Sequence, residues 1–385
     1  MKRILMYTND KIYTTERMTG GIKRFKMLYD GLVKMGYDVT LFCGESKEVL
    51  DKYNKNAFSI NRNIKKKRFF NGINIYFNNR KLIKNLKKEN YDEVIVFDVP
   101  TAIGLCLKKI KNINLFLRQD LIEYRKIVLF ENRKNVLYRL IYLTFMSICE
   151  FICCKRSRRI IVQCNYDLDN LINRHKFIRK LIAKKSYVQI NNVNAPWIIE
   201  KSTKTKVEKI KNPDLFSICF IGDFSNTRKG HDVLLPALKR IIDEQYKIKC
   251  HIIGDGQLLS QVKKEYTDFN NIVFHGRMSN PLEIVKSSNL VIVPSRADSC
   301  PNTVLESLYN DVLVIGSNRG GIPEILDNEK LLFELNINSI VSKVKTLIDN
   351  RELYNELKKI EENRKKELSF DWTKKIANIM EATND

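Results

Sequence analysis

Residues 294–326, PSRADSCPNTVLESLYNDVLVIGSNRGGIPEIL, hold the pattern that decides the fold. An apolar run of strand length, residues 291–294, leads into a loop of small and polar residues. Pro301 then marks a helix start, where proline loses no hydrogen bond because that N–H lacks a helical partner anyway. With Asn302 and Thr303 behind it, this start presents free N–H groups and a positive dipole end to the loop, which suits a phosphate.

An acid pair and a second strand-to-helix turn complete the stretch. Asp298 precedes the turn, and Glu306 lies eight residues further on, inside the predicted helix. A second strand over residues 312–315 ends in Asn318-Arg319-Gly320-Gly321, which begins another helix carrying Glu324. Two such turns with two carboxylates between them predict a cradle for a nucleotide sugar.

Length and charge set the frame around this stretch. A chain of 385 residues is longer than one compact core usually supports, so we expect two domains, residues 1–195 and 196–370. The net charge of +24 is uneven: residues 1–195 carry 40 Lys and Arg against 17 Asp and Glu, a net +23, and the remainder carries +1. The positive charge of residues 1–195 favours a negatively charged partner, either an anionic membrane surface or an anionic acceptor.

The remaining composition indicates a reduced protein without a leader. The first ten residues, MKRILMYTND, turn polar too early for a signal peptide. The nine cysteines lack the spacing of a metal site, so we expect free thiols, no metal, and a cytoplasmic location. The most apolar stretch, residues 136–154 (VLYRLIYLTFMSICEFICC), contains Arg139 and Glu150, which argues against a membrane span. It is either a core helix or one that lies in the membrane interface.

Strand-like runs alternate with helical periodicity throughout, which predicts two parallel, doubly wound sheets of an α/β protein. In the first half the strands are expected at residues 3–7, 39–43, 73–77, 93–97, 114–117, 159–163 and 187–192. In the second half they are expected at residues 215–221, 250–253, 272–274 and 290–293, ahead of the stretch quoted above. Ligands bind beyond the carboxyl ends of such strands, which selects Asp98 and the group Arg118-Gln119-Asp120 as candidates. A lysine-rich connector over residues 200–212 reads as a linker.

Taken together, these motifs resemble the family-4 retaining glycosyltransferases of glycosyltransferase group 1. The family's two acids, separated by seven residues and followed by a strand and a Gly-Gly-x-x-Glu turn, match Asp298, Glu306 and residues 320–324, although Asp298 stands where the family usually has Glu. The resemblance implies the GT-B fold, in which two Rossmann-like domains face a central cleft, with a terminal helix near residues 371–385 that returns to the first domain. It covers residues 216–326 strongly and residues 2–193 more loosely.

The resemblance also implies roles at matching positions. Arg228 and Lys229, between Gly222 and Gly230, would clamp the donor diphosphate. The backbone at Arg277 and Met278 would read the nucleobase. Glu306 would accept hydrogen bonds from the ribose, and Asp298 from the sugar. The remaining predicted site residues are Gly20 and Gly21 beside the donor or acceptor, and Glu324 at the donor sugar or as a helix cap. Asp120 is predicted on the acceptor side, near a position where the family often has His.

The implied reaction transfers a sugar from a nucleotide diphosphate-sugar, with retention and without a metal or other cofactor, to a glycan or lipid-linked acceptor. Bacterial surface polysaccharide synthesis, such as that of lipopolysaccharide or capsule, is the expected setting, with the protein cytoplasmic and peripheral at the inner face of the membrane. Three alternatives stay open, the first of which is a catalytically inactive scaffold of the same fold, since Asp298 replaces the family's usual Glu. A nucleotide-sugar 2-epimerase has the same fold but needs no acceptor, and a basic nucleic-acid-binding protein would explain the charge but not the donor-type motifs.

Overall fold

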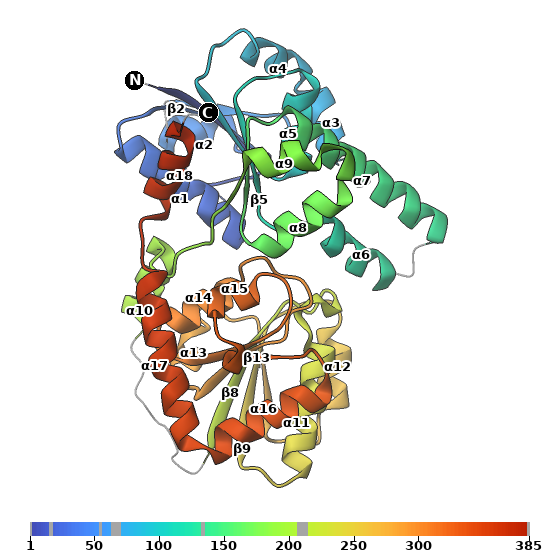
Figure 1. Ribbon diagram of the computed structural model, residues 1–385, viewed down its shortest axis with the longest axis vertical. Coiled ribbons are helices and arrows are strands. Elements are labelled where there is room, and N and C mark those ends of the chain that lie inside the picture. Colours follow the sequence, from blue (N-terminus) through green and yellow to red (C-terminus); the bar gives the residue numbers. More distant parts are fainter. Residues whose placement is uncertain are drawn as a thin grey trace. The chain divides into compact units, whose positions relative to one another are not determined.

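The computed structural model describes residues 2–14, 18–53, 56–62, 71–131, 135–205 and 215–382, with residues 71–73 described by their backbone alone. The chain forms two compact units, coloured along the sequence in Figure 1. The first unit consists of residues 1–122, 135–189 and 371–385, and the second of residues 123–134 and 190–370.

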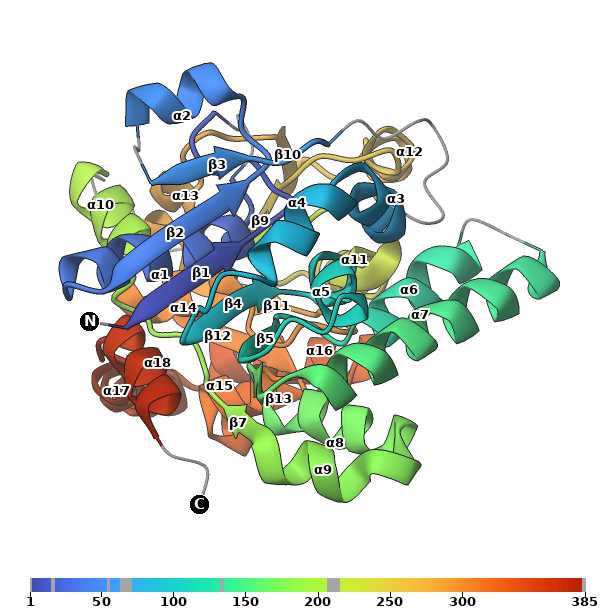
Figure 2. The ribbon, with the colours of Figure 1, turned by 90° about the horizontal axis from the view of Figure 1, so that it is seen from above.

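The first unit is built on a seven-stranded parallel sheet with the order β3-β2-β1-β4-β5-β6-β7. Figure 2 shows β3, β2, β1, β4 and β5 following one another across this sheet. Its strands are β1 Arg3–Tyr7, β2 Asp38–Cys43, β3 Ala57–Ser59, β4 Glu93–Phe97, β5 Ile113–Leu117, β6 Arg159–Val162 and β7 Ser186–Val188. Every residue of β4, β5 and β6 is buried, as expected for parallel strands covered by helices on both faces. The strand order reverses between β1 and β4, which is where such sheets bind ligands.

The helices of the first unit include one that comes from the far end of the chain. They are α1 Gly20–Lys34, α2 Lys47–Tyr53, α3 Asn71–Asn78, α4 Arg80–Leu86, α5 Val99–Leu107, α7 Val136–Arg156, α8 Asn165–Arg174, α9 Arg179–Lys185 and α18 Trp372–Glu381, with a 3-10 turn, η2, at Lys176–Ile178. Helix α6, Leu121–Glu131, runs from the first unit into the second. Helix α18 packs on α1, where the guanidinium of Arg24 lies 5.4 Å from the Trp372 ring centre. Arg159 donates hydrogen bonds to the carbonyl groups of Met380 and Ala382.

The second unit is built on a six-stranded parallel sheet with the order β10-β9-β8-β11-β12-β13. Its strands are β8 Phe216–Ile221, β9 Ile248–Ile253, β10 Ile272–Gly276, β11 Leu290–Val293, β12 Leu313–Ser317 and β13 Leu332–Phe333. Its helices are α10 Pro196–Lys204, α11 His231–Asp243, α12 Leu259–Glu265, α13 Leu282–Ser287, α14 Asn302–Tyr309, α15 Ile322–Leu326, α16 Ile337–Asp349 and α17 Arg351–Glu367. Here the order reverses between β8 and β11. The two parallel sheets with flanking helices confirm the predicted α/β class.

Three local predictions were wrong. Residues 73–77 form part of helix α3, not a strand, because an apolar run this short fits either period. Packing on α5 decides the outcome: Ile75 is buried, and Gly104 in α5 leaves room for Tyr76, whose Cβ would lie 3.0 Å from a Cβ at that glycine. The last strand of the first sheet is only Ser186–Val188, and β3 had no recognisable pattern. Of the expected linker, residues 200–204 belong to α10, and residues 206–214 lie outside the described residues.

Candidate functional site

The strand-end loops of the second unit bring the predicted donor residues to one edge of its sheet. Gly222 follows β8, Asp298 follows β11, and Gly320 follows β12. Since parallel strands end at the same edge, these loops are neighbours, and the β8 loop carries Arg228 and Lys229 into the point where the strand order reverses.

One carboxylate joins the two predicted clamp residues. Asp298 Oδ1 accepts a hydrogen bond from Arg228 Nη1, and Asp298 Oδ2 accepts one from Lys229 Nζ, each at 2.6 Å. The three side chains are between 14% and 18% exposed, so the cluster is shielded but still reachable from solvent. Two cations and one anion leave a net positive charge at this point of the site.

The charge state of Asp298 follows from these neighbours. Burial by itself would raise the pKa of Asp298, but the adjacent Lys229 and Arg228 charges outweigh burial and lower the pKa to about 2. Asp298 is therefore ionised at neutral pH. In the ligand-free protein it acts as the counter-ion of both clamp residues.

The guanidinium of Arg228 makes further contacts through Nη1, whereas its Nε–H group has no acceptor among the described residues. Its Nη1 also donates to the carbonyl oxygen of Ala297 at 3.2 Å, and its guanidinium lies 5.4 Å from the ring centre of Tyr124. Its Nε is buried and has no hydrogen-bond partner among the described residues. A buried N–H group without an acceptor is costly, and an incoming phosphate oxygen is the kind of acceptor that would satisfy it.

Gly230 fixes the clamp loop against the loop that carries Asp298. It adopts a left-handed backbone with φ of 75°, and a Cβ there would lie 1.8 Å from the carbonyl oxygen of Pro294. Beside it, the Arg296 N–H donates to the carbonyl oxygen of Arg228 at 2.8 Å. Only glycine permits this close approach, so Gly230 positions the clamp although it contributes no side chain.

Gly320 and Gly321 hold Asp298 from the other side. Gly320 has φ of 61°, and a Cβ there would lie 2.4 Å from the carbonyl oxygen of Asp298. The N–H of Gly321 donates to that same oxygen at 2.9 Å. This hydrogen bond orients the Asp298 loop. Helix α15, which follows and contains Glu324, has only five residues.

Helix α14 begins as the sequence predicts, with a small shift. Pro301 is its N-cap rather than its first helical residue, and no side-chain hydrogen bond caps the helix. Asn302 and Thr303 are the first two helical residues and are half-buried, as is Glu306 one turn later. The start of α14 therefore offers backbone N–H groups to the Asp298 loop.

The other predicted donor residues occupy neighbouring loops. The N–H of Gly222 donates to the carbonyl oxygen of Ile253, and a Cβ on this glycine would lie 3.2 Å from that of Lys229. Beyond β10, Arg277 is exposed and Met278 half-buried. Both positions belong to the same sheet edge, but two strands, β9 and β8, lie between β10 and β11, the strand that Asp298 follows.

In the first unit, the predicted residue Gly21 lies against Arg118, another of the candidates at the strand ends. Gly20 and Gly21 are the first residues of α1, and a Cβ on Gly21 would lie 1.3 Å from Arg118 Nη1. Arg118 Nε donates to Asp98 Oδ2 at 2.8 Å, and its Nη2 binds the same oxygen. Asp98 itself has φ of 65°, an uncommon value for a residue with a side chain. The ligand-binding edge of this sheet thus contains an ion pair set against the start of α1.

Asp120, the predicted acceptor-side acid, belongs to a buried charge network. Its carboxylate accepts hydrogen bonds from Arg174 Nη2 at 2.7 and 2.5 Å, and its side chain is only 5% exposed. Arg174 Nη1 also binds Glu150, which contacts His175 Nε2 at 2.8 Å. Burial alone would lower the pKa of Arg174, but these carboxylates raise it overall. The structure therefore shows Asp120 as an ion-pair partner.

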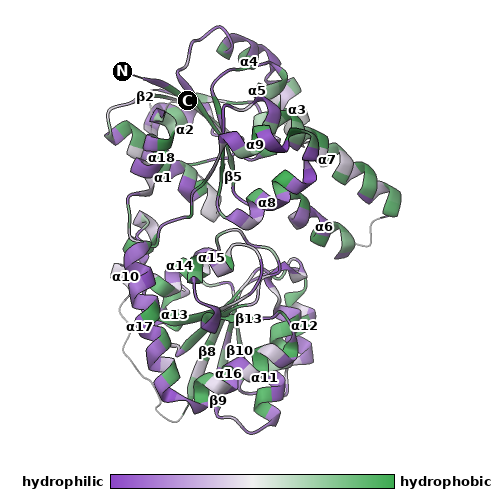
Figure 3. Cartoon of the chain, viewed as in Figure 1, coloured by the Kyte–Doolittle hydropathy of each residue, from purple (hydrophilic) through white to green (hydrophobic). Residues whose placement is uncertain are grey.

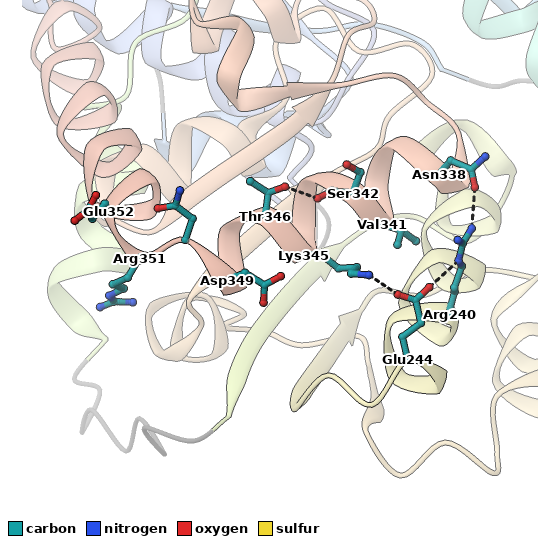
Figure 4. Close-up of a pocket in the computed structure, with 11 residues that line it drawn as sticks. Arg240, Glu244, Asn338, Val341, Ser342, Lys345, Thr346, Asp349, Arg351 and Glu352 are labelled. Atoms are coloured by element: carbon teal, nitrogen blue, oxygen red, sulfur yellow. Dashed lines mark hydrogen bonds and ion pairs between the residues drawn. The ribbon is translucent and has the colours of Figure 1, made fainter.

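A separate hollow of about 950 Å³ lies along α11 and α16 (Figure 4). Its polar side chains bind one another: Glu244 accepts hydrogen bonds from Arg240 at 3.0 Å and from Lys345 at 2.6 Å. None of the described residues that line it belongs to the predicted site.

Comparisons with known proteins point to one family. Residues 201–366 match the family model of glycosyl transferases group 1. Protein CapJ of Staphylococcus aureus is 28% identical over 139 residues, which cover 34% of this chain and 36% of CapJ. The O-antigen biosynthesis glycosyltransferase WbnH of Escherichia coli is 23% identical over 175 residues, 45% of this chain and 50% of WbnH. The chain therefore matches between about a third and a half of the length of these relatives.

Solved structures resemble the whole chain. A glycosyltransferase from Rickettsia africae superposes with a TM-score of 0.70 at 19% identity, covering 99% of this chain and 98% of that chain. Anabaena Alr3699/HepE in complex with UDP superposes with a TM-score of 0.66 at 13% identity, covering 100% of both chains. At these identities the likeness concerns the fold, and it confirms the GT-B class predicted from the sequence.

Proposed function

We propose that the protein transfers a sugar from a nucleoside diphosphate-sugar to a glycan or lipid-linked acceptor, because residues 201–366 match the family model of glycosyl transferases group 1. The observation that carries the proposal is the convergence of Arg228 and Lys229 on Asp298 at the strand-order reversal of the second sheet. A family match alone does not show which residues act on the substrate. The cluster of Arg228, Lys229 and Asp298 carries a net positive charge, which suits the binding of a diphosphate.

The clamp acts on the leaving group. When the bond between the anomeric carbon and the diphosphate breaks, negative charge grows on the phosphate oxygen. Arg228 and Lys229 stabilise that charge where it develops, together with the N–H groups at the start of α14. Since these fixed cations can neutralise the diphosphate, the proposed reaction needs no metal.

The two acids of the site divide substrate recognition between them. Asp298 accepts hydrogen bonds from the sugar hydroxyls, and Glu306 accepts them from the ribose. Gly320, Gly321 and Glu324 support the donor sugar side, and the backbone at Arg277 and Met278 takes the base. We further propose retention of the anomeric configuration, with the donor phosphate taking the acceptor proton on the same face.

The setting of the reaction is proposed from the relatives. WbnH is named as an O-antigen biosynthesis glycosyltransferase, and a further relative, CapH, as a capsular polysaccharide biosynthesis glycosyltransferase. The fold neighbour HepE is complexed with UDP. These names support a uridine diphosphate donor and surface polysaccharide synthesis as the setting. We further propose that the transferred sugar is a hexose and that the protein works at the cytoplasmic face of the membrane.

A thermal-shift screen with UDP-, GDP- and ADP-sugars tests the donor class, because a ligand that binds the native state raises its melting temperature. We expect one nucleotide class to stabilise the wild type and to have little effect on Arg228→Ala. Stabilisation of both proteins alike would remove the clamp from donor binding. The 2-epimerase alternative is separated by product analysis without acceptor, since only an epimerase would then convert the sugar.

A further inference from the structure

Helix α7 is fixed to the first unit by one side only. Tyr142, Met146, Cys149 and Cys153 recur every three or four residues and are buried, with α7 packed chiefly on α5. Glu150 on this side is buried in its contacts with Arg174 and His175 described above. A carboxylate paired in this way ties the helix to α8.

The other side of α7 is apolar and uncovered. Leu137 is 63% exposed, Leu140 58%, Ile141 52% and Ile148 53%. The hydropathy colouring of Figure 3 shows the green, hydrophobic character of the projecting end of α7. Among the described residues, α7 alone is long and apolar enough to cross a membrane, yet only 28% of its apolar window is buried. The contacts of Glu150 with Arg174 and His175 attach the opposite side of the helix to the protein.

A basic segment with an exposed aromatic side chain lies beside α7. Phe177 is fully exposed, at 101% of its reference area, between the exposed Lys176 and the exposed Arg179 and Lys180. Lys184 of α9 is also exposed.

Two contacts place this segment next to the C-terminal half of α7. The Lys185 ammonium group donates to the Ser157 carbonyl oxygen at 2.8 Å, just past the end of the helix. The His175 ring centre lies 5.8 Å from that of Phe151 in α7. The exposed Ile148 belongs to this half of α7, and Leu137, Leu140 and Ile141 continue the apolar side of the helix towards its N-terminus.

We propose that the exposed apolar side of α7, together with residues 176–184, is a docking surface for an anionic lipid bilayer. We call this surface the α7–α9 face. Its apolar side chains enter the acyl boundary, and its lysines and arginine meet the anionic headgroups, as in helices that lie in a membrane interface.

Charge favours the bilayer over a second copy of the chain. Residues 1–195 carry a net +23, and residues 176–184 contain Lys176, Arg179, Lys180 and Lys184 without an Asp or Glu. A symmetric dimer through the α7–α9 face would bring two such basic segments together, whereas an anionic membrane neutralises them. The inference rests on the proposed location at the membrane and names the surface and the lipid class that would serve it, but it does not depend on the transfer reaction.

The test is co-sedimentation of the full chain with vesicles of phosphatidylcholine, with and without phosphatidylglycerol, at low and high salt. The wild type should bind the anionic vesicles and keep part of this binding at high salt, since apolar insertion is not screened. Leu140→Ala with Ile141→Ala should remove the salt-resistant part. Lys180→Gln with Lys184→Gln should weaken binding at low salt by about fivefold per charge, the equivalent of ~1 kcal/mol for each basic residue at an anionic surface.

Two control variants change exposed apolar residues and exposed lysines of the first unit that lie outside the α7–α9 face. Val33→Ala with Leu107→Ala truncates exposed apolar residues, and Lys84→Gln with Lys88→Gln removes two exposed charges. Both controls should bind vesicles as the wild type does. The proposal is overturned if the wild type ignores anionic vesicles at low salt, or if the controls lose binding as much as the α7–α9 variants. It is also overturned if sedimentation velocity shows a dimer that the α7 variants dissociate while no vesicle binding occurs. Nucleotide binding, measured in parallel, keeps this outcome separate from the transferase proposal.

Discussion

The carboxylate of Asp298 lies 2.6 Å from the ammonium nitrogen of Lys229 and contacts Arg228 at the same distance. This acid binds both of the cations that are proposed to bind the donor diphosphate. A diphosphate must therefore compete with Asp298, and an intact donor offers Asp298 its sugar hydroxyls in exchange. The arrangement favours the intact nucleotide sugar over the bare nucleoside diphosphate.

Asp298→Asn should consequently strengthen the binding of inorganic pyrophosphate and of UDP by about tenfold, because the competing charge-assisted contacts disappear. The same variant should weaken the binding of the intact donor relative to UDP. Isothermal titration calorimetry measures both. Asp311→Asn is the control, since it removes an equal charge from an exposed pair with Lys365. Weaker pyrophosphate binding by Asp298→Asn alone would contradict the competition.

Glu306→Gln should weaken UDP by about tenfold, the scale of losing a hydrogen bond to a charged group, and should leave pyrophosphate unchanged because pyrophosphate lacks the ribose. Competition binding experiments with UDP and with pyrophosphate show whether Glu306 contacts the ribose or the phosphates. Glu283→Gln, on the exposed side of α13, provides the matched control. Equal losses for UDP and pyrophosphate would place Glu306 at the phosphates instead.

Gly230→Ala should unfold the protein at a much lower temperature than Gly36→Ala. Both glycines have a left-handed φ, 75° and 88°, so each alanine meets a conformational penalty of about 1–2 kcal/mol. Only at Gly230 does the new Cβ also collide with backbone, the Pro294 carbonyl oxygen, whereas nothing lies within 4 Å at Gly36. Thermal denaturation measures the melting temperatures of the two variants. Similar melting temperatures would mean that the loops carrying Gly230 and Pro294 can move apart at little cost.

The histidine pair of the second sheet predicts a pH dependence of stability. His251 Nδ1 lies 2.9 Å from His275 Nε2. Burial, then the neighbouring His275 and Lys249, lower the pKa of His251 from 6.5 to about 4. As the pH falls, His251 is therefore protonated in the unfolded chain at a higher pH than in the folded protein. The folded state is consequently most stable above pH 6.5, and this stabilisation is lost as the pH falls towards 4.

The expected loss over this range is about 2–3 kcal/mol of unfolding free energy. Urea unfolding of the wild type and of His251→Asn, at neutral and at mildly acidic pH, measures it as the difference between their pH slopes. Parallel slopes would show that His251 titrates alike in the folded and unfolded chains.

Much of the second unit could be predicted because its signals are local. Most of its strands contain a continuous apolar run, and the residues that follow them, such as Gly222 and Gly320, mark turns within a few positions. The contact that organises the site is not local. Asp298 meets Lys229 across 69 positions of sequence, and it does so because Gly230 lets one loop approach the other. No periodicity encodes such a pairing.

The first unit was harder to predict, for two physical reasons. Residues 73–77 are too few to show a period, so packing on α5 and not their pattern makes them helical. Helix α7 is apolar on both sides, and sequence alone does not distinguish a fully covered helix from one that is covered on one side. The partner of Asp120 was also out of reach, since Arg174 lies 54 positions away.

The most direct test of the central claim is the release of nucleoside diphosphate from a nucleotide sugar. The enzyme is incubated with the sugar nucleotide that stabilises it and with a lipid extract as acceptor source, and the released nucleoside diphosphate is quantified over time. The account predicts release by the wild type and a roughly 10²–10³-fold lower rate for Arg228→Ala and for Lys229→Ala, the scale of losing one stabiliser of transition-state charge. Release at the wild-type rate by both variants would contradict it.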